Sequence, residues 1–290
     1  MKLLSSNIKI QSAIALMIAA SYANAQKPTR MEHTIKSGYA PVNGIQMYYE
    51  IHGQGGIPLV LIHGGGSTIE TSWGNMLPLL SVHGEVIAVE LQAHGRTTDR
   101  DAPESFEQDA DDVAGLLKYI KINKANFFGF SNGGTTTLQI AIRHPEIVNK
   151  AISTAGAYRR DGFFQGFFDG FEGATLSSMP KPLQNAFLKV TPDHARLQNM
   201  FNKDVERMKN FKDIPDELLS SIKAPVLIMD GDQDVITVEH SARMARAIKG
   251  GRLAIIPGAH GAYIGEAGNT KPGDKLPEAT AILVEEFLNS

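Results

Sequence analysis

Residues 125–134 read A-N-F-F-G-F-S-N-G-G, a serine flanked by glycines between an apolar run and a helix-forming segment. A G-x-S-x-G pattern between a strand and a helix is typical of a nucleophile elbow. Side chains at positions 129 and 133 would collide with nearby backbone in so tight a turn, which lifts the serine hydroxyl clear of the sheet. The pattern predicts that Ser131 is a nucleophile. The same pattern also occurs in ordinary loops, so this interpretation requires a base, an acid and an oxyanion site elsewhere.

A base is expected from the end of the last predicted strand. Serine is a weak nucleophile until a base takes its proton. Of the nine histidines, His260 follows the apolar run 252–256 directly and emerges where that strand ends. Parallel strands present their carboxyl ends on one side, so His260 is expected at the same edge as Ser131.

The acid that orients this histidine is expected from the preceding strand, which ends in M-D-G-D-Q-D at 229–234. Three carboxylates compete there. Asp230 ends the strand, and Asp232 lies in the turn, where bonding to nearby backbone N–H groups is the usual role. Asp234 is far enough past the turn to reach His260 and is the predicted acid, with Asp232 as the alternative.

The oxyanion of an attacked carbonyl needs preorganised N–H donors. The elbow supplies one, the backbone N–H of Asn132. The other is expected from H-G-G-G at 63–66, where the missing side chains allow substrate to approach the backbone. Gly65 is the predicted donor and Gly64 the alternative, while His63 is expected to support the loop.

The wider pattern predicts one α/β domain. Hairpin strands are expected over 33–40 and 44–53, with a turn at Asn43-Gly44. Strands at 58–62, 85–91, 150–154, 225–229 and 252–256 alternate with helices at 105–122, 135–144, 238–248 and 277–288. Such alternation favours a parallel sheet covered on both faces. It breaks off over 157–222, an insertion at the carboxyl edge of the sheet, where ligand crevices open.

The helix predicted over 105–122 has a readable start. Ser105 is expected to cap it, with Gln108 reaching back in a capping box. Glu107, Asp109, Asp111 and Asp112 favour the positive end of the helix dipole. A calcium site made by these acids is the alternative.

These motifs together resemble the α/β-hydrolase family, in the form of a serine esterase or lactonase with a helical cap. The resemblance rests on H-G-G-G at 63–66, G-F-S-N-G at 129–133, G-D-Q-D at 231–234 and P-G-A-H at 257–260, in the family's order. It implies a mostly parallel eight-stranded sheet flanked by helices, with a helical cap between strands 6 and 7. The core is then 26–156 with 223–290, and the cap 157–222.

A serine nucleophile with an oxyanion hole favours acyl transfer, so the expected activity is hydrolysis of carboxylic esters or lactones. Relatives that open epoxides or displace halide use an aspartate at the elbow, so Ser131 argues against both reactions. Carbon–carbon bond hydrolysis and cofactor-free perhydrolysis remain alternatives on the same triad. A non-catalytic binding protein is the alternative from another class, although it would be expected to carry damaged catalytic positions.

The cap is expected to set the substrate. Five phenylalanines recur at helical spacing between 163 and 171. One interpretation is that they pack the cap; the other is that some line a large apolar pocket over Ser131, roofing bulky hydrophobic esters or macrolide-type lactones. The candidate pocket residues are Trp73, Phe163, Phe164, Phe167 and Phe168. For Trp73, packing in the core is the favoured alternative.

The N-terminus predicts a secretory signal peptide of bacterial type. Lys2 and Lys9 precede or flank an apolar stretch at 13–20, and A-N-A at 23–25 predicts a cut after Ala25. The apolar run is shorter than the roughly 20 residues of a membrane span. The protein is therefore expected to be exported to the periplasm or secreted, without stable membrane insertion.

Composition limits the partners. A net charge of −3 does not favour nucleic acid or an anionic membrane. The chain has no cysteine, so it carries neither disulfides nor a lipoprotein anchor, and its 42% hydrophobic content must supply the core. No metal-ligand or phosphate-loop motif occurs, so neither metal nor cofactor is expected. The expected partner is a small-molecule ester or lactone.

Overall fold

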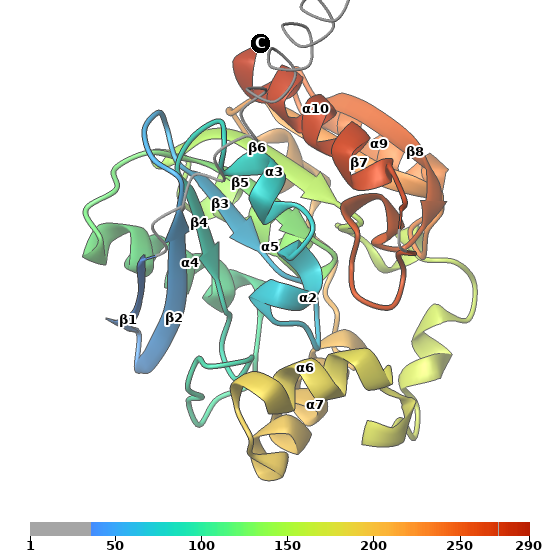
Figure 1. Cartoon of the computed structure of the whole chain (residues 1–290). Helices are drawn as coiled ribbons and strands as arrows, with labels where there is room; N and C mark the ends of the chain where they lie inside the picture. The colour runs from blue at the N-terminus through green and yellow to red at the C-terminus, as the bar shows by residue number, and fades with distance from the viewer. Residues whose placement is uncertain (1–35, 272) are drawn as a thin grey trace, which may run out of the picture. The chain divides into compact units, whose positions relative to one another are not determined.

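The computed structural model describes residues 36–271 and 273–290 (Figure 1). The signal peptide predicted for residues 1–25 lies outside the described residues. The strands of the described chain are β1 (Lys36–Val42), β2 (Ile45–His52), β3 (Leu59–Ile62), β4 (Val86–Val89), β5 (Ala125–Phe130), β6 (Val148–Thr154), β7 (Val226–Gln233) and β8 (Arg252–Ala259).

These strands form one sheet in the order β1-β2-β4-β3-β5-β6-β7-β8. Strand β2 runs antiparallel to both β1 and β4, whereas the later neighbours are all parallel. Strands β3, β4 and β5 are buried along their whole length, as expected of parallel strands covered on both faces. The predicted mostly parallel, eight-stranded sheet is confirmed.

The hairpin between β1 and β2 has the predicted turn. Val42 pairs with Ile45, so Asn43 and Gly44 form a two-residue connection. Both turn residues have positive φ, 44° for Asn43 and 88° for Gly44. Asn-Gly tolerates this conformation, which matches the twist of the flanking strands.

Helices cover both faces of the sheet. The helices of the described chain are α2 (Ile69–Trp73), α3 (Leu77–Leu80), α4 (Phe106–Tyr119), α5 (Asn132–Arg143), α6 (Lys181–Val190), α7 (His194–Lys209), α8 (Asp216–Ser220), α9 (Val238–Ala247) and α10 (Leu276–Asn289). Shorter 3₁₀ turns are η1 (Arg160–Gly162), η2 (Phe167–Phe171), η3 (Leu176–Ser178) and η4 (Ala262–Ile264).

Two apolar clusters hold these layers together. Val113 of α4, Leu138 of α5 and Met244 of α9 belong to the cluster on one face of the sheet. Trp73 of α2 and Val284 of α10 belong to the cluster on the other. The helices thus bury their apolar faces against opposite sides of the same strands, as the alternation of strands and helices predicts.

Helix α4 begins as predicted but is capped by one half of the expected box. The Ser105 hydroxyl accepts from the backbone N–H of Gln108 at 3.1 Å. The side chain of Gln108 does not reach back; it donates to Asp112 at 2.9 Å. The acids of this helix also do more than favour its dipole, since Asp111 pairs with Arg143 at 2.7 Å.

Between β6 and β7 lies the predicted helical segment, built from η1 to η3 and α6 to α8. The helix implied by the phenylalanine spacing over 163–171 is wrong, because the regular helical structure in this stretch is limited to the 3₁₀ turn η2. Gly166 has φ 86°, a left-handed conformation that interrupts an α-helix. The phenylalanines nevertheless stack together, with 4.4 Å between the ring centroids of Phe163 and Phe167.

We call residues 157–222 the cap. In Figure 1, α6 and α7 lie beyond the edge toward which the central strands point. An apolar cluster that includes Phe187, Leu197 and Met200 joins these two helices to Ala93, which follows β4. The cap therefore packs against the carboxyl edge of the sheet, and its boundaries as a separate domain remain a prediction.

Candidate active site

The turn at Ser131 is strained and closely packed. Ser131 has φ 55° and ψ −118° directly before helix α5. A Cβ at Gly129 would lie 1.9 Å from the carbonyl oxygen of Gly133, and one at Gly133 would lie 2.2 Å from that of Ile62. Only glycine fits at these two positions, so the elbow geometry that the sequence predicts is the one that forms.

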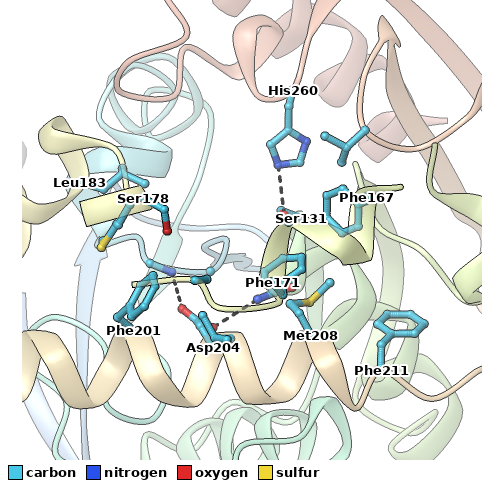
Figure 2. Close-up of a pocket in the computed structure, with 18 of the residues that line it drawn as sticks. Ser131, Phe167, Phe171, Ser178, Leu183, Phe201, Asp204, Met208, Phe211 and His260 are labelled. Carbon is cyan, nitrogen blue, oxygen red and sulfur yellow. Dashed lines mark hydrogen bonds between the residues drawn. The ribbon is translucent and has the colours of Figure 1, made fainter. Parts of the chain in front are cut away.

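His260 lies against this serine. Its Nε2 atom is 3.1 Å from Ser131 Oγ, a contact drawn in Figure 2, and its Nδ1 atom is 2.6 Å from Asp234 Oδ1. The imidazole also packs on the ring of Phe130, with 4.7 Å between centroids. One hydrogen-bonded chain therefore joins the serine hydroxyl, the imidazole and the carboxylate.

Sheet register explains why Asp234 makes this contact. Gln233 at the end of β7 pairs with Ala259 at the end of β8, so the next residues along each strand meet. Asp234 Oδ1 also accepts from the backbone N–H of Val235 at 2.6 Å. The alternative acid, Asp232, instead accepts from the backbone N–H of Gly258 at 2.8 Å, the turn role expected of it.

The carboxylate controls the protonation of the imidazole. Burial alone would lower the pKa of His260, but the hydrogen bond and the charge of Asp234 outweigh burial and raise the pKa above its ordinary value. The bond from Nδ1 to the carboxylate leaves Nε2 directed at the hydroxyl. His260 is therefore positioned and tuned to act as a general base towards Ser131.

We call residues 63–66 the oxyanion loop, and hydrogen-bond accounting within it favours one donor. The Gly64 N–H donates to Ser72 Oγ at 3.4 Å, and the Gly66 N–H donates to Asp204 Oδ2 at 2.6 Å. Within the described chain, the N–H of Gly65 has no such side-chain acceptor, so it is the loop N–H that is free to bind an oxyanion. A Cβ at Gly65 would be 2.6 Å from Asn132 Nδ2, so the two predicted donor residues are neighbours.

His63 supports this loop and does not face Ser131. Its Nδ1 donates to the carbonyl oxygen of Gly64 at 2.7 Å, and its Nε2 accepts from the N–H of Leu91 at 3.0 Å. Burial lowers the pKa of His63 to about 3, so the ring is neutral. It joins the end of β3 to the residues that follow β4.

A cavity of about 380 Å³ opens in front of Ser131 and His260 (Figure 2). Of the five pocket candidates, Phe163 and Phe167 line it. Phe164 is 49% exposed, and Trp73 is fully buried against Phe128 in the core. Neither these two nor Phe168 is a wall residue. Further apolar walls come from the cap residues Phe171, Met179, Leu183, Met200, Phe201, Met208 and Phe211.

Asp204 of α7 is a cavity residue that the sequence reasoning missed. Charged residues on a long helix usually face solvent, and no role was predicted for Asp204. A signal was present: Met200, Asp204 and Met208 recur every four residues, which places the acid within the buried stripe of the helix. Figure 2 shows Asp204 reaching up from α7 beneath Ser131.

The described chain has no cluster of three or more His, Asp or Glu side chains suited to a metal ion. The calcium site considered for the start of α4 is thus not formed there. Within 36–271 and 273–290, no helix is both long and apolar enough to cross a membrane.

Comparison with known proteins places this chain in a family. A profile described as the alpha/beta hydrolase fold matches residues 57–217, more than half of the chain. The chain belongs to the α/β-hydrolase fold family. The serine hydrolase BPHL of Homo sapiens is 29% identical to this α/β-hydrolase over 246 residues, 80% of this chain and 82% of that protein. The chain is accordingly a serine hydrolase of this fold.

Solved structures agree in fold. The enol-lactonase from Burkholderia xenovorans LB400 has a TM-score of 0.68 at 24% identity, covering 87% of this α/β-hydrolase and all of that chain (100%). The 2-hydroxy-6-oxo-6-phenylhexa-2,4-dienoate hydrolase from Rhodococcus sp. strain RHA1 has a TM-score of 0.70 at 18% identity, covering 89% and 100%. At these identities the likeness shows the shared architecture alone.

The raised pKa of His260 predicts how kcat/KM depends on pH. Only the neutral imidazole can accept the serine proton, so kcat/KM should fall as pH is lowered through the pKa of His260, with a midpoint above the ordinary value of about 6.5. Asp234→Asn removes the charge that raises this pKa. It should lower kcat by about 10⁴-fold and move the midpoint to lower pH.

Asp232→Asn is the matched control, because its side-chain oxygen can still accept from Gly258. Both variants are assayed from pH 5 to 9 against wild type. Equal losses in the two variants, or an unshifted midpoint in Asp234→Asn, would contradict the assignment of Asp234.

Proposed function

We propose that this α/β-hydrolase cleaves carboxylic esters or lactones through an acyl-enzyme intermediate on Ser131. The observation that carries the proposal is the hydrogen-bonded chain from Ser131 through His260 to Asp234, which opens on an apolar cavity. The backbone N–H groups of Gly65 and Asn132 flank the same opening and form the proposed oxyanion hole.

The acylation half-reaction follows from this geometry. His260 Nε2 takes the proton of Ser131 as Oγ attacks the carbonyl carbon, and the two N–H groups stabilise the tetrahedral oxyanion. Asp234 stabilises the imidazolium that forms. The imidazolium then gives its proton to the leaving alkoxide, so the alcohol departs and the acyl group remains on Oγ.

Deacylation uses the same groups in reverse. His260 removes a proton from water, the hydroxide attacks the acyl carbon, and the proton returns to Ser131 as the acid is released. A lactone differs in one respect, because its alcohol and acyl groups belong to the same molecule. The alcohol therefore stays attached to the acyl-enzyme, and the product is a single hydroxy acid.

The cavity favours a bulky, uncharged acyl or lactone group. Its walls are mainly apolar and include five phenylalanine and three methionine side chains, and a volume of about 380 Å³ lies within the range of small-molecule sites. Methionine side chains adapt to irregular shapes, which suits a large ring or branched chain. Macrolide-type lactones are therefore included in the proposed substrate class.

Carbon–carbon bond hydrolysis is the second candidate, favoured by the fold shared with the Rhodococcus dienoate hydrolase. A dienoate is an anion, and a site for it needs a cation or free donors. Among the described wall residues of the cavity, none is lysine or arginine. The charge of the cavity therefore favours neutral esters and lactones over dienoates.

Covalent labelling tests the nucleophile. A fluorophosphonate should modify wild type at Ser131 and abolish ester hydrolysis, because the phosphonyl group traps the activated oxygen. Ser131→Ala should be unlabelled and lose at least about 10⁴-fold in kcat. Mass spectrometry of the modified peptide and initial rates on an ester and lactone panel measure both. Normal turnover by Ser131→Ala would contradict the proposal.

A pair of adjacent phenylalanines tests the cavity. Phe163→Ala removes a cavity wall and should change the ratio of kcat/KM for bulky to acetyl esters by about tenfold. Phe164→Ala, at a position 49% exposed, should leave the ratio within about twofold of wild type. The ratio is measured on one preparation, so loss of folded protein cancels. Equal shifts in both variants would overturn the assignment of the wall.

We also propose that the protein is exported, on the strength of the predicted N-terminal signal peptide. In a Gram-negative host, the chain should be recovered outside the cytoplasm with Gln26 as its first residue. N-terminal sequencing of fractionated cells is the measurement, and a variant lacking residues 2–25 is the control that should stay inside. Recovery of wild type with an intact N-terminus in the cytoplasm would contradict export.

A further inference from the structure

One carboxylate of the cap lies within the proposed catalytic machinery. Asp204 Oδ2 accepts from the N–H of Gly66 at 2.6 Å, and Oδ1 lies 3.4 Å from Asn132 Nδ2. Figure 2 shows both contacts as dashed lines from Asp204. Helix α7 thus binds the oxyanion loop and the residue after the nucleophile with a single side chain, which is 138 residues from Gly66 in the sequence.

Two cations hold this carboxylate in place. His94 Nε2 lies 3.0 Å from Asp204 Oδ2, and Arg207, one turn further along α7, pairs with Oδ1. His94 Nδ1 donates to the carbonyl oxygen of Gln92 at 2.8 Å, so Nε2 carries a proton toward the carboxylate only if the ring is charged. The acidic surroundings raise the pKa of His94 to about 9 against the effect of burial, which makes it charged at neutral pH.

Asp204 is therefore a saturated anion and not a site for a substrate cation. Burial would raise the pKa of Asp204, but the charges of His94 and Arg207 outweigh it and hold the pKa well below the ordinary range. Both oxygens already accept from protein donors. The paired cations also remove the repulsion that a bare carboxylate would exert on an oxyanion.

The position of the oxyanion loop depends on these contacts. Gly66 has φ 68°, and its N–H lies 2.6 Å from Asp204 Oδ2 and 3.2 Å from His94 Nε2, so Asp204 is the nearer of the two groups that set the plane of the peptide that follows Gly65. A Cβ at Gly65 would meet Asn132 Nδ2 at 2.6 Å and Asp204 Oδ1 at 3.3 Å. The oxyanion loop, the elbow and the Asp204 carboxylate are in close contact. Removal of the carboxylate therefore changes the distance between the loop and the elbow.

We propose that Asp204 is a positioning residue that holds the oxyanion loop in register with the N–H of Asn132, so that the oxyanion hole is complete only while α7 is seated on the core. The proposal rests on the proposed acyl-transfer function. Its distinctive consequence is that a cap residue governs stabilisation of the transition state and not binding of the substrate.

Steady-state kinetics separates these roles. Asp204→Ala should lower kcat by about 30- to 100-fold with KM within about threefold of wild type, because misplaced donors weaken transition-state contacts. Asp204→Asn retains an oxygen that can accept from Gly66 and should recover part of the loss. The Ki of a trifluoromethyl ketone, which forms a tetrahedral adduct, should rise in parallel with the fall in kcat.

Lys203→Met is the matched control. Lys203, the preceding residue on α7, also ties the cap to the core, with Nζ 2.7 Å from Asp99 Oδ1 and 2.8 Å from the carbonyl oxygen of Arg100. It touches neither the oxyanion loop nor Asn132. If α7 matters only as an anchor, Lys203→Met should lose as much kcat as Asp204→Ala, and that result would overturn the proposal.

Other outcomes are equally decisive. A rise in KM with kcat unchanged would make Asp204 a binding residue and contradict the positioning role. If Asp204→Ala does not fold, as judged by its Tm, the isosteric Asp204→Asn carries the test through its kcat and Ki. Failure of the proposed function is distinct, since wild type would then neither label at Ser131 nor hydrolyse the panel.

Discussion

At Gly133, helix α5 lies so close to strand β3 that a Cβ would be 2.2 Å from the carbonyl oxygen of Ile62. This approach fixes three features at once. It holds Ser131 at positive φ, it brings the N–H of Asn132 to the start of the oxyanion loop, and it fixes the height of the serine above the sheet. The loop follows Ile62 directly, so elbow and loop cannot be placed independently.

A cluster of buried charges continues this arrangement into the cap. Arg207 of α7 pairs with Asp109 of α4 at 2.8 Å as well as with Asp204, and Glu104 lies 3.4 Å away. Buried charges are tolerated when they are paired, and breaking such a pair is costly. Burial raises the pKa of Glu104 above its ordinary value, while the positive charges of Arg207 and His94 oppose this rise.

Most of the fold could be predicted from the sequence, because glycine turns and continuous apolar runs are local signals. The sequence also brought Ser131, Asp234 and His260 to one edge, because parallel strands share a carboxyl side. The sequence did not predict the secondary structure of the cap correctly. The spacing of the phenylalanines is helical, yet Gly166 in its left-handed conformation breaks the helix. Asp204 was missed because Gly66, His94 and Asn132, which it contacts at the site, are distant in the chain, and only its place in an apolar stripe marked it.

Helix α7 presents both Met200 and Met208 to the cavity and Asp204 to the oxyanion loop. From the proposed role of Asp204, it follows that the same helix, α7, affects both the substrate range and the turnover rate. A change that reshapes the cavity through α7 also shifts the carboxylate, so selection for a new substrate would act on the rate in the same step. Phe167 and Phe171 of η2 also line the cavity, so variation there changes the substrate range without replacing a residue of α7.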